Sequence, residues 1–180
     1  RLSNGARVLV KPTDFKEDEI VLRAWSPGGT SLLPDLVARS ASHATEVASR
    51  SGLGSFDRGD LERLLSGEQV SLTPYIRGNS EGFSGSSSKG DFETLLQLLY
   101  LSFTSPRLEE DAFDSYMRRL RQEVATRAND PRGAFQLRLQ ELYAQGDPRQ
   151  APISPDNVDQ IVQALDHLGV EPPALAHIVL

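Results

Sequence analysis

The sequence predicts an α+β domain, a two-layer sandwich in which helices cover one side of a mostly antiparallel sheet. Three observations support this fold class. The chain has 180 residues, of which 38% are hydrophobic, which is enough for one compact domain with an ordinary core. Short strand-like segments come in consecutive pairs. Helical segments fill the second half of the chain and do not alternate with single strands.

The chain is expected to begin with two strands. Residues 6–11 (A-R-V-L-V-K) and 20–25 (I-V-L-R-A-W) are short and rich in β-branched residues. A polar connector, P-T-D-F-K-E-D-E, separates them, and the glycine-bearing S-P-G-G-T-S at residues 26–31 ends the second one.

A long helix is predicted over residues 34–50, because Pro34 suits the first turn of a helix. At about 100° per residue, one face of this helix carries Leu36, Ser40, Ala44 and Val47. A shorter helix is expected next, capped by Asp57 and closed at Gly67.

A hairpin is predicted in the middle of the chain. Residues 70–76 alternate like a strand, and the chain turns and returns over residues 82–88. Pro74 has no N–H to donate to a neighbouring strand, so the first strand of the hairpin is expected to lie at a sheet edge or to bend. The small residues of G-F-S-G-S-S-S are expected to let the second strand pack closely beneath a helix.

Four helices and a final strand are predicted to complete the chain. Asp91 is expected to cap a helix over residues 92–103, which is apolar on nearly every side and therefore predicted to be deeply buried. The other helices are expected over residues 109–128, 131–142 and 154–169. Residues 176–180 are the candidate for one more strand.

Composition limits the function classes. The net charge is −6 and the pI is near 5.1, so no basic field attracts phosphate backbones and nucleic acid is not an expected partner. The absence of cysteine excludes disulfides, thiolate zinc ligands and cysteine nucleophiles. The longest apolar run, residues 95–101, is far shorter than the roughly 20 residues of a membrane span, so no span is expected. The missing initiating Met suggests a piece of a longer polypeptide.

The stretch S-H-A-T-E-V at residues 42–47 differs at one position from the zinc-binding pattern H-x-x-E-H. That pattern places two imidazoles on one helix face, aimed at one metal, with the glutamate as base for the bound water. Here Val47 replaces the second histidine, and valine has no lone pair to give. Spacing alone therefore favours a structural role, with His43 partly buried and hydrogen-bonded to a neighbour such as Glu46.

No other sequence pattern points to a reaction. The remaining histidines, His167 and His177, make no ligand spacing with His43. The sequence contains neither the G-x-S-x-G elbow of serine hydrolases nor a nucleotide-binding glycine pattern.

Several stretches, taken in order, resemble one known family. They are L-S-N-G-A-R-V, S-P-G-G-T-S-L, S-G-L-G-S-F, Y-I-R-G-N-S-E-G-F-S-G-S-S and D-F-E-T-L-L-Q-L-L-Y-L-S-F-T-S-P-R. Together they are similar to the non-catalytic, C-terminal half of bacterial periplasmic zinc proteases in the insulinase/pitrilysin family, over residues 2–145. The resemblance implies a mitochondrial-processing-peptidase-like (LuxS/metallohydrolase-like) lobe and a periplasmic location.

The resemblance also implies where a metal site would have been. In the catalytic lobe of that family, H-x-x-E-H and a later glutamate hold zinc; carried over, His43 matches the first histidine, Glu46 the base, Val47 the second histidine and Glu123 the distal glutamate. With one ligand of three lost, no catalytic residue and no metal are expected in this chain. His43 and Glu123 are then vestigial ligands, and zinc is expected in the companion catalytic lobe.

The implied function is that of a lobe, inactive alone, which helps enclose peptide substrates in a clamshell chamber with the catalytic lobe of the same polypeptide. Two alternatives remain open. One is an active metalloendopeptidase fragment that uses His43, Glu46 and Glu123, and the other is a structural module like the core subunits of mitochondrial respiratory complexes, without proteolysis. Residues 1–180 are expected to form one such lobe, truncated at its C-terminus, and residues 170–180 fit the family pattern less well.

Overall fold

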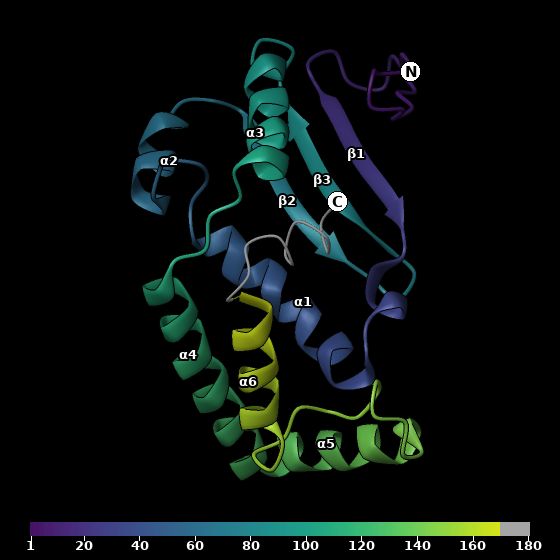
Figure 1. Cartoon of the computed structure of the whole chain (residues 1–180), viewed down its shortest axis with the longest axis vertical. Coiled ribbons are helices and arrows are strands. Elements are labelled where there is room, and N and C mark those ends of the chain that lie inside the picture. The colour runs from purple at the N-terminus through teal and green to yellow at the C-terminus, as the bar shows by residue number, and fades with distance from the viewer. Residues whose placement is uncertain (170–180) are drawn as a thin grey trace.

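The computed structural model describes residues 1–169, with all side chains except those of residues 36 and 165–169. Three antiparallel strands form one sheet, and a group of helices extends beyond one end of it (Figure 1). The strands are β1 (Ile20–Pro27), β2 (Val70–Ile76) and β3 (Ser80–Ser87). The helices are α1 (Asp35–Arg50), α2 (Arg58–Leu64), α3 (Phe92–Thr104), α4 (Glu110–Asn129), α5 (Pro131–Ala144) and α6 (Val158–Gly169), besides a short 3-10 turn, η1 (Gly29–Leu32). The predicted α+β class is confirmed.

β3 is the central strand of the sheet and pairs antiparallel with both β1 and β2. Burial alternates along β1, because successive side chains of a strand point to opposite faces. Leu22 and Leu72 share the inner face, while Val21 and Trp25 lie on the outer face. Pro74 lies in β2, an outer strand of the sheet, as predicted from its missing N–H.

Small residues in β3 allow close packing on both sides of the strand. A Cβ at Gly82, whose φ is +153°, would lie 2.1 Å from the carbonyl oxygen of Ala24 in β1. A Cβ at Gly85 would lie 2.9 Å from the side chain of Leu95 in α3. The prediction that a small-residue strand packs beneath a helix is therefore confirmed.

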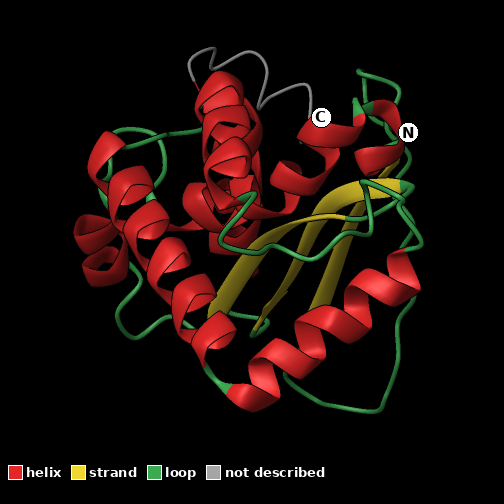
Figure 2. Cartoon of the chain, turned by 90° about the horizontal axis from the view of Figure 1, so that it is seen from below, coloured by secondary structure: helices red, strands yellow, loops and turns green. Residues whose placement is uncertain are grey.

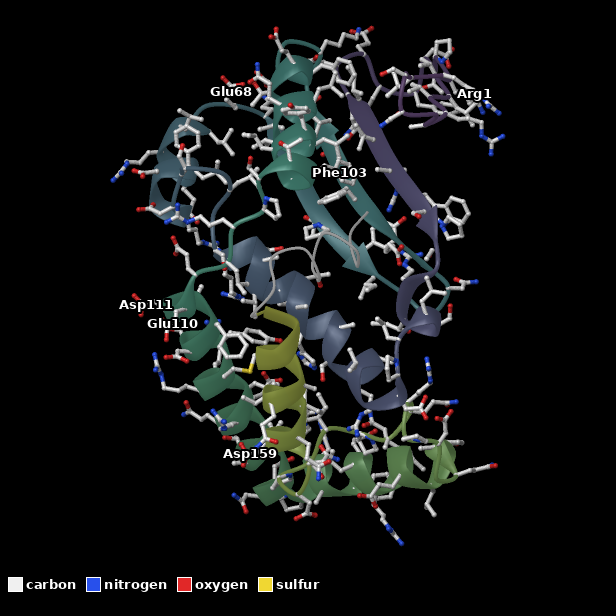
Figure 3. All side chains as sticks on the ribbon, viewed as in Figure 1. Arg1, Glu68, Phe103, Glu110, Asp111 and Asp159 are labelled. Carbon is white, nitrogen blue, oxygen red and sulfur yellow. The ribbon has the colours of Figure 1, made fainter. Side chains whose placement is uncertain are left out.

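The helices form two groups. Helix α3 packs on β2 and β3, where Phe103 meets Phe83 edge-on with 5.1 Å between ring centroids (Figure 3). Away from α3, helices α1, α4 and α6 meet in a second core. Figure 2 shows the three strands as one twisted layer among the helices. The buried residues of the second core are Ala44, Val47, Met117, Leu120, Val124, Val158 and Ile161.

One of the two predicted aspartate caps is present. The carboxylate of Asp57 accepts a backbone N–H in the first turn of α2, and that of Asp130, which was not predicted as a cap, does the same for α5. Asp91 does not cap α3. Its carboxylate instead accepts the N–H of Gln69 at 2.9 Å and the hydroxyl of Ser88 at 2.7 Å, which ties the hairpin ends to the start of the helix.

Residues 6–11 do not form the predicted strand. Leu9 and Val10 in this segment are 92% and 85% exposed. Within residues 1–169, β1 pairs with β3 alone, so no strand supplies hydrogen bonds to residues 6–11. Because β-branched residues favour a strand only where a partner and a surface to pack on exist, the local preference is not expressed here.

The predicted deep burial of α3 is also wrong. Leu95 and Leu98 are buried, but Tyr100 is 67% exposed, and Leu96 is exposed as well. An apolar helix is buried all round only when it has neighbours all round, and α3 packs on the sheet with one side.

The last described helix begins later than predicted. Residues 154–157 form a turn in which the N–H of Ser154 donates to the side chain of Asn157 at 3.0 Å, and α6 starts at Val158. This turn explains why Ser154 reads like a helix start in the sequence. The strand predicted for residues 176–180 lies outside the described residues.

Candidate functional site

Helix α1 carries the stretch that resembles a zinc motif. Its residues His43, Glu46 and Val47 follow one another on a regular helix that begins directly after Pro34. Val47 is only 2% exposed and lies in the core between α1, α4 and α6. The position that matches the second histidine of the motif therefore faces an apolar interior.

His43 has a specific partner on a neighbouring helix. Its Nδ1 lies 2.6 Å from the hydroxyl of Tyr116 on α4, and the two rings are tilted by 47° with 5.9 Å between centroids. The sequence-based expectation of a partly buried, hydrogen-bonded histidine is confirmed, but the partner is Tyr116 rather than Glu46. This hydrogen bond joins α1 to α4.

Both carboxylates that match the motif are paired with arginines. Glu46 lies 3.6 Å from Arg50 on α1, and Glu123 lies 3.8 Å from Arg127 on α4. The guanidinium of Arg50 also lies over the ring of Tyr116, 5.9 Å from its centroid. The surroundings of His43 thus already contain a fixed cation, which opposes the approach of a divalent metal ion.

The burial of this cluster shifts two pKa values. Burial lowers the pKa of His43, and Arg39 adds to this effect, while the charges of Glu46 and Glu123 oppose it. Burial, followed by the charge of Glu46, raises the pKa of Tyr116. Both shifts favour an uncharged imidazole and an uncharged phenol at neutral pH. His43 and Tyr116 therefore form a hydrogen bond between uncharged side chains that links α1 to α4.

The residues around His43 do not fit zinc. Zinc in catalytic sites is held by three protein ligands, and here Val47, buried in the apolar core, offers none. Among residues 1–169, no group of three or more His, Cys, Asp or Glu residues is arranged to hold a metal ion. The vestigial assignment of His43 and Glu123 stays a prediction. His177, and the side chain of His167, lie outside the description.

Two members of the cluster, Tyr116 and Arg50, were not anticipated from the sequence. A signal for Tyr116 exists, because it precedes Glu123 by two helical turns and so shares its face of α4. Arg50 follows Glu46 by one turn of α1. If α1 and α4 are aligned so that Glu123 lies near His43, Tyr116 and Arg50 are expected near His43 as well.

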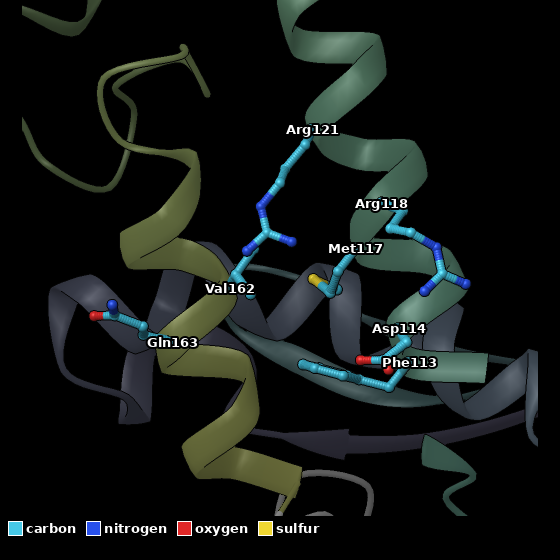
Figure 4. Close-up of a pocket in the computed structure, with 7 residues that line it drawn as sticks. All are labelled: Phe113, Asp114, Met117, Arg118, Arg121, Val162 and Gln163. Carbon is cyan, nitrogen blue, oxygen red and sulfur yellow. The ribbon is translucent and has the colours of Figure 1, made fainter. Parts of the chain in front are cut away.

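A separate groove of about 400 Å³ lies between α4 and α6 (Figure 4). Met117 and Val162 contribute apolar surface, and Arg121 on its rim forms an ion pair with Asp159 at 2.8 Å. Figure 3 labels Asp159 near the start of α6. The lining contains neither a histidine nor a nucleophilic side chain, and its remaining residues are Phe113, Asp114, Arg118 and Gln163.

None of the helices in residues 1–169 combines the length and the apolar character that crossing a bilayer requires.

Comparison with known proteins relates the chain to proteases. No protein-family model matches it. It is 26% identical over 121 residues, 67% of this chain, to the probable zinc protease PqqL of Haemophilus influenzae, and 29% identical over 142 residues, 78% of this chain, to a PQQL-like zinc protease of Arabidopsis thaliana. The chain spans 13% and 12% of the length of these relatives.

A solved structure shows the same fold. The periplasmic protease PqqL from Escherichia coli matches with a TM-score of 0.72 at 22% sequence identity. The match covers 96% of this chain and 19% of that protein.

Proposed function

Because the chain is homologous to one stretch of PqqL-type zinc proteases, we propose that it is a non-catalytic lobe of a zinc metallopeptidase of the insulinase/pitrilysin type. The observation that carries the proposal is the burial of Val47 in the helical core, at the position of the motif's second histidine. Since a zinc peptidase needs that ligand, we assign the zinc and the cleavage step to another lobe of the same polypeptide.

The share of the relatives that the chain covers supports a role as one lobe among several. The chain spans 13% and 12% of the two proteases in sequence and 19% of the Escherichia coli protein in structure. Most of such a protease therefore lies outside a unit of this size. In the proposal, residues 1–180 belong to a single lobe.

The proposed role is to close a chamber around a peptide rather than to cleave it. The residues that match the family's catalytic positions make contacts within the fold. Val47 packs in the helical core, His43 is hydrogen-bonded to Tyr116, and Glu123 forms an ion pair with Arg127. The proposed location is the periplasm, supported by the likeness to a periplasmic protease. The peptide substrates and the catalytic lobe are the proposed partners.

Zinc counting tests the proposal directly. The purified chain is incubated with excess zinc and desalted, and the bound metal is measured by atomic absorption. We expect far less than one zinc per chain, because the side chain at the position of the second histidine ligand is an alkyl group buried in the core.

One zinc per chain, lost in His43→Ala and in Glu123→Gln, would contradict the proposal and favour the active-fragment alternative. Glu141→Gln is the matched control, because Glu141 is an exposed glutamate on α5 that pairs with Arg138 away from this cluster. Zinc that this control also loses would indicate non-specific surface binding.

A further inference from the structure

Among residues 1–169, the side chains of one face of the sheet, its outer face, are largely exposed. Helix α3 packs against the inner face, where Leu95 approaches Gly85. On the outer face, the side chains of Val21 and Trp25 in β1 are 65% and 66% exposed. The register places eleven residues on this outer face: Val21, Arg23, Trp25, Pro27, Ser71, Thr73, Tyr75, Ser80, Gly82, Ser84 and Ser86.

The outer face differs in charge from the chain as a whole. The chain has a net charge of −6, yet none of the eleven outer-face residues is acidic, and Arg23 is exposed among them. Arg77, just beyond β2, lies over the ring of Tyr75 with 5.1 Å to its centroid. The carboxylate of Glu81 is buried on the opposite face, where it accepts the N–H of Gly29. The outer face is therefore locally cationic.

The outer face combines small side chains with two large aromatic ones. β3 contributes only glycine and serine to this face. The side chain of Tyr75 crosses β3 at Gly82 and its hydroxyl donates to the carbonyl oxygen of Ala24 at 3.2 Å, beside the exposed ring of Trp25. The hydroxyl groups suit a face in contact with water, whereas Val21 and Trp25 expose apolar surface that a covering element would bury.

We propose that this outer face docks another segment of the same full-length polypeptide, one that presents apolar side chains together with carboxylates. The inference rests on the proposed function, in which this chain is one lobe of a longer protease. The chain spans only 13% and 12% of its relatives, so most of such a polypeptide is available to supply the segment. A tethered segment binds at high effective concentration, so two cations and a small apolar patch are enough to hold it.

Site-specific cysteine labelling of the full-length protein tests the proposal. This chain contains no cysteine, so a single cysteine can report on one face: Thr73→Cys on the outer face, and Gln122→Cys on the exposed side of α4 as control. Labelling by N-ethylmaleimide is followed at each site by peptide mass spectrometry. We expect the outer-face site to react about tenfold more slowly than the control in the native protein, and equally fast in urea.

Charge reversal at Arg23 identifies what holds the segment. In the Thr73→Cys background, Arg23→Glu is expected to raise labelling to the control rate, while Arg23→Lys keeps the protection. Ser71→Cys, also exposed on this face, serves as a second reporter if Thr73→Cys does not fold.

Two outcomes would overturn the docking proposal. Equal labelling at both faces in the native protein would mean that no tethered segment covers the sheet. Protection that disappears on dilution would mean that a second copy of the chain is the occupant. Neither outcome depends on zinc content, so this test fails or succeeds separately from the proposed function.

Discussion

The side chain of Val47 fills space that an imidazole would have to share with a packed core. Val47 contacts the cluster of α1, α4 and α6, in which Met117 and Val124 are also almost fully buried. Introducing a histidine there would bury two ring nitrogens, and His43 is already bonded to Tyr116. The substitution Val47→His, which completes the H-x-x-E-H pattern, is therefore not expected to create a zinc site.

The first prediction concerns that restoration. Val47→His is expected to lower the free energy of unfolding by about 1–3 kcal/mol, because a polar ring is buried without partners. Urea unfolding with and without zinc measures it, with Val47→Ala as the control that loses packing but adds no polar group. A rise in the unfolding midpoint with stoichiometric zinc, seen in Val47→His alone, would show that the site can be rebuilt by one substitution.

The second prediction concerns pH and His43. Burial holds the pKa of folded His43 below its ordinary value of 6.5, so the unfolded chain binds the proton more readily. The stability that the neutral ring contributes is fully present above pH 6.5 and is lost as the pH falls through 6.5 toward the folded-state pKa.

Urea unfolding at pH 7.5 and 5.5 measures this effect in the wild-type chain and in His43→Gln. The wild type is expected to lose more stability on acidification than the variant, because His167, His177 and the carboxylates are common to both. Equal losses in the two proteins would mean that the folded and unfolded pKa values of His43 do not differ.

At the scale of the elements, the sequence predicts local structure well and partners poorly. The strands around residues 20–25 and 70–88 and all six helices were predicted, because alternation, helical periodicity and punctuation by Asp, Pro and Gly act over a few residues. The strand at residues 6–11 and the burial of α3 were predicted wrongly, because each depends on a distant neighbour. The His43–Tyr116 bond spans 73 residues and has no local signature.

The third prediction concerns the central strand. Gly82→Ala is expected to cost about 2–3 kcal/mol, because a Cβ would lie 2.1 Å from the carbonyl oxygen of Ala24 at a φ of +153°. Gly78→Ala is the matched control: a Cβ there would meet no atom within 4 Å. Thermal and urea unfolding of both variants provide the comparison. Similar stabilities would mean that β1 and β3 can separate without penalty.

At the scale of the whole molecule, the described residues make a fold with two cores, one under the sheet and one between helices. The candidate metal position lies at the helical core rather than at the sheet, and Val47 there packs against apolar side chains. The type of fold could be inferred from the order of elements, but these contacts could not, since they depend on which side chains meet across α1 and α4.

The fourth prediction concerns activity. The chain alone, with zinc supplied, is expected not to hydrolyse unstructured fluorogenic peptides above the buffer rate, because no described group is arranged to activate a metal-bound water. Fluorescence release over hours measures this. Zinc-dependent hydrolysis that disappears in Glu46→Gln but persists in Glu62→Gln, an exposed glutamate of α2, would show that the chain is a peptidase in its own right.

Because of Pro74, the two edges of the sheet differ in their ability to pair with an additional strand. A strand arriving beside β2 would find a missing amide in the middle of that edge, whereas β1 has no proline before its last residue, Pro27. Any lengthening of the hydrogen-bonded ladder, whether by a neighbouring molecule or in an aggregate, is therefore directed to the β1 side. Capping that one border with a charged or proline-bearing strand would be enough to keep concentrated preparations from polymerising through this ladder.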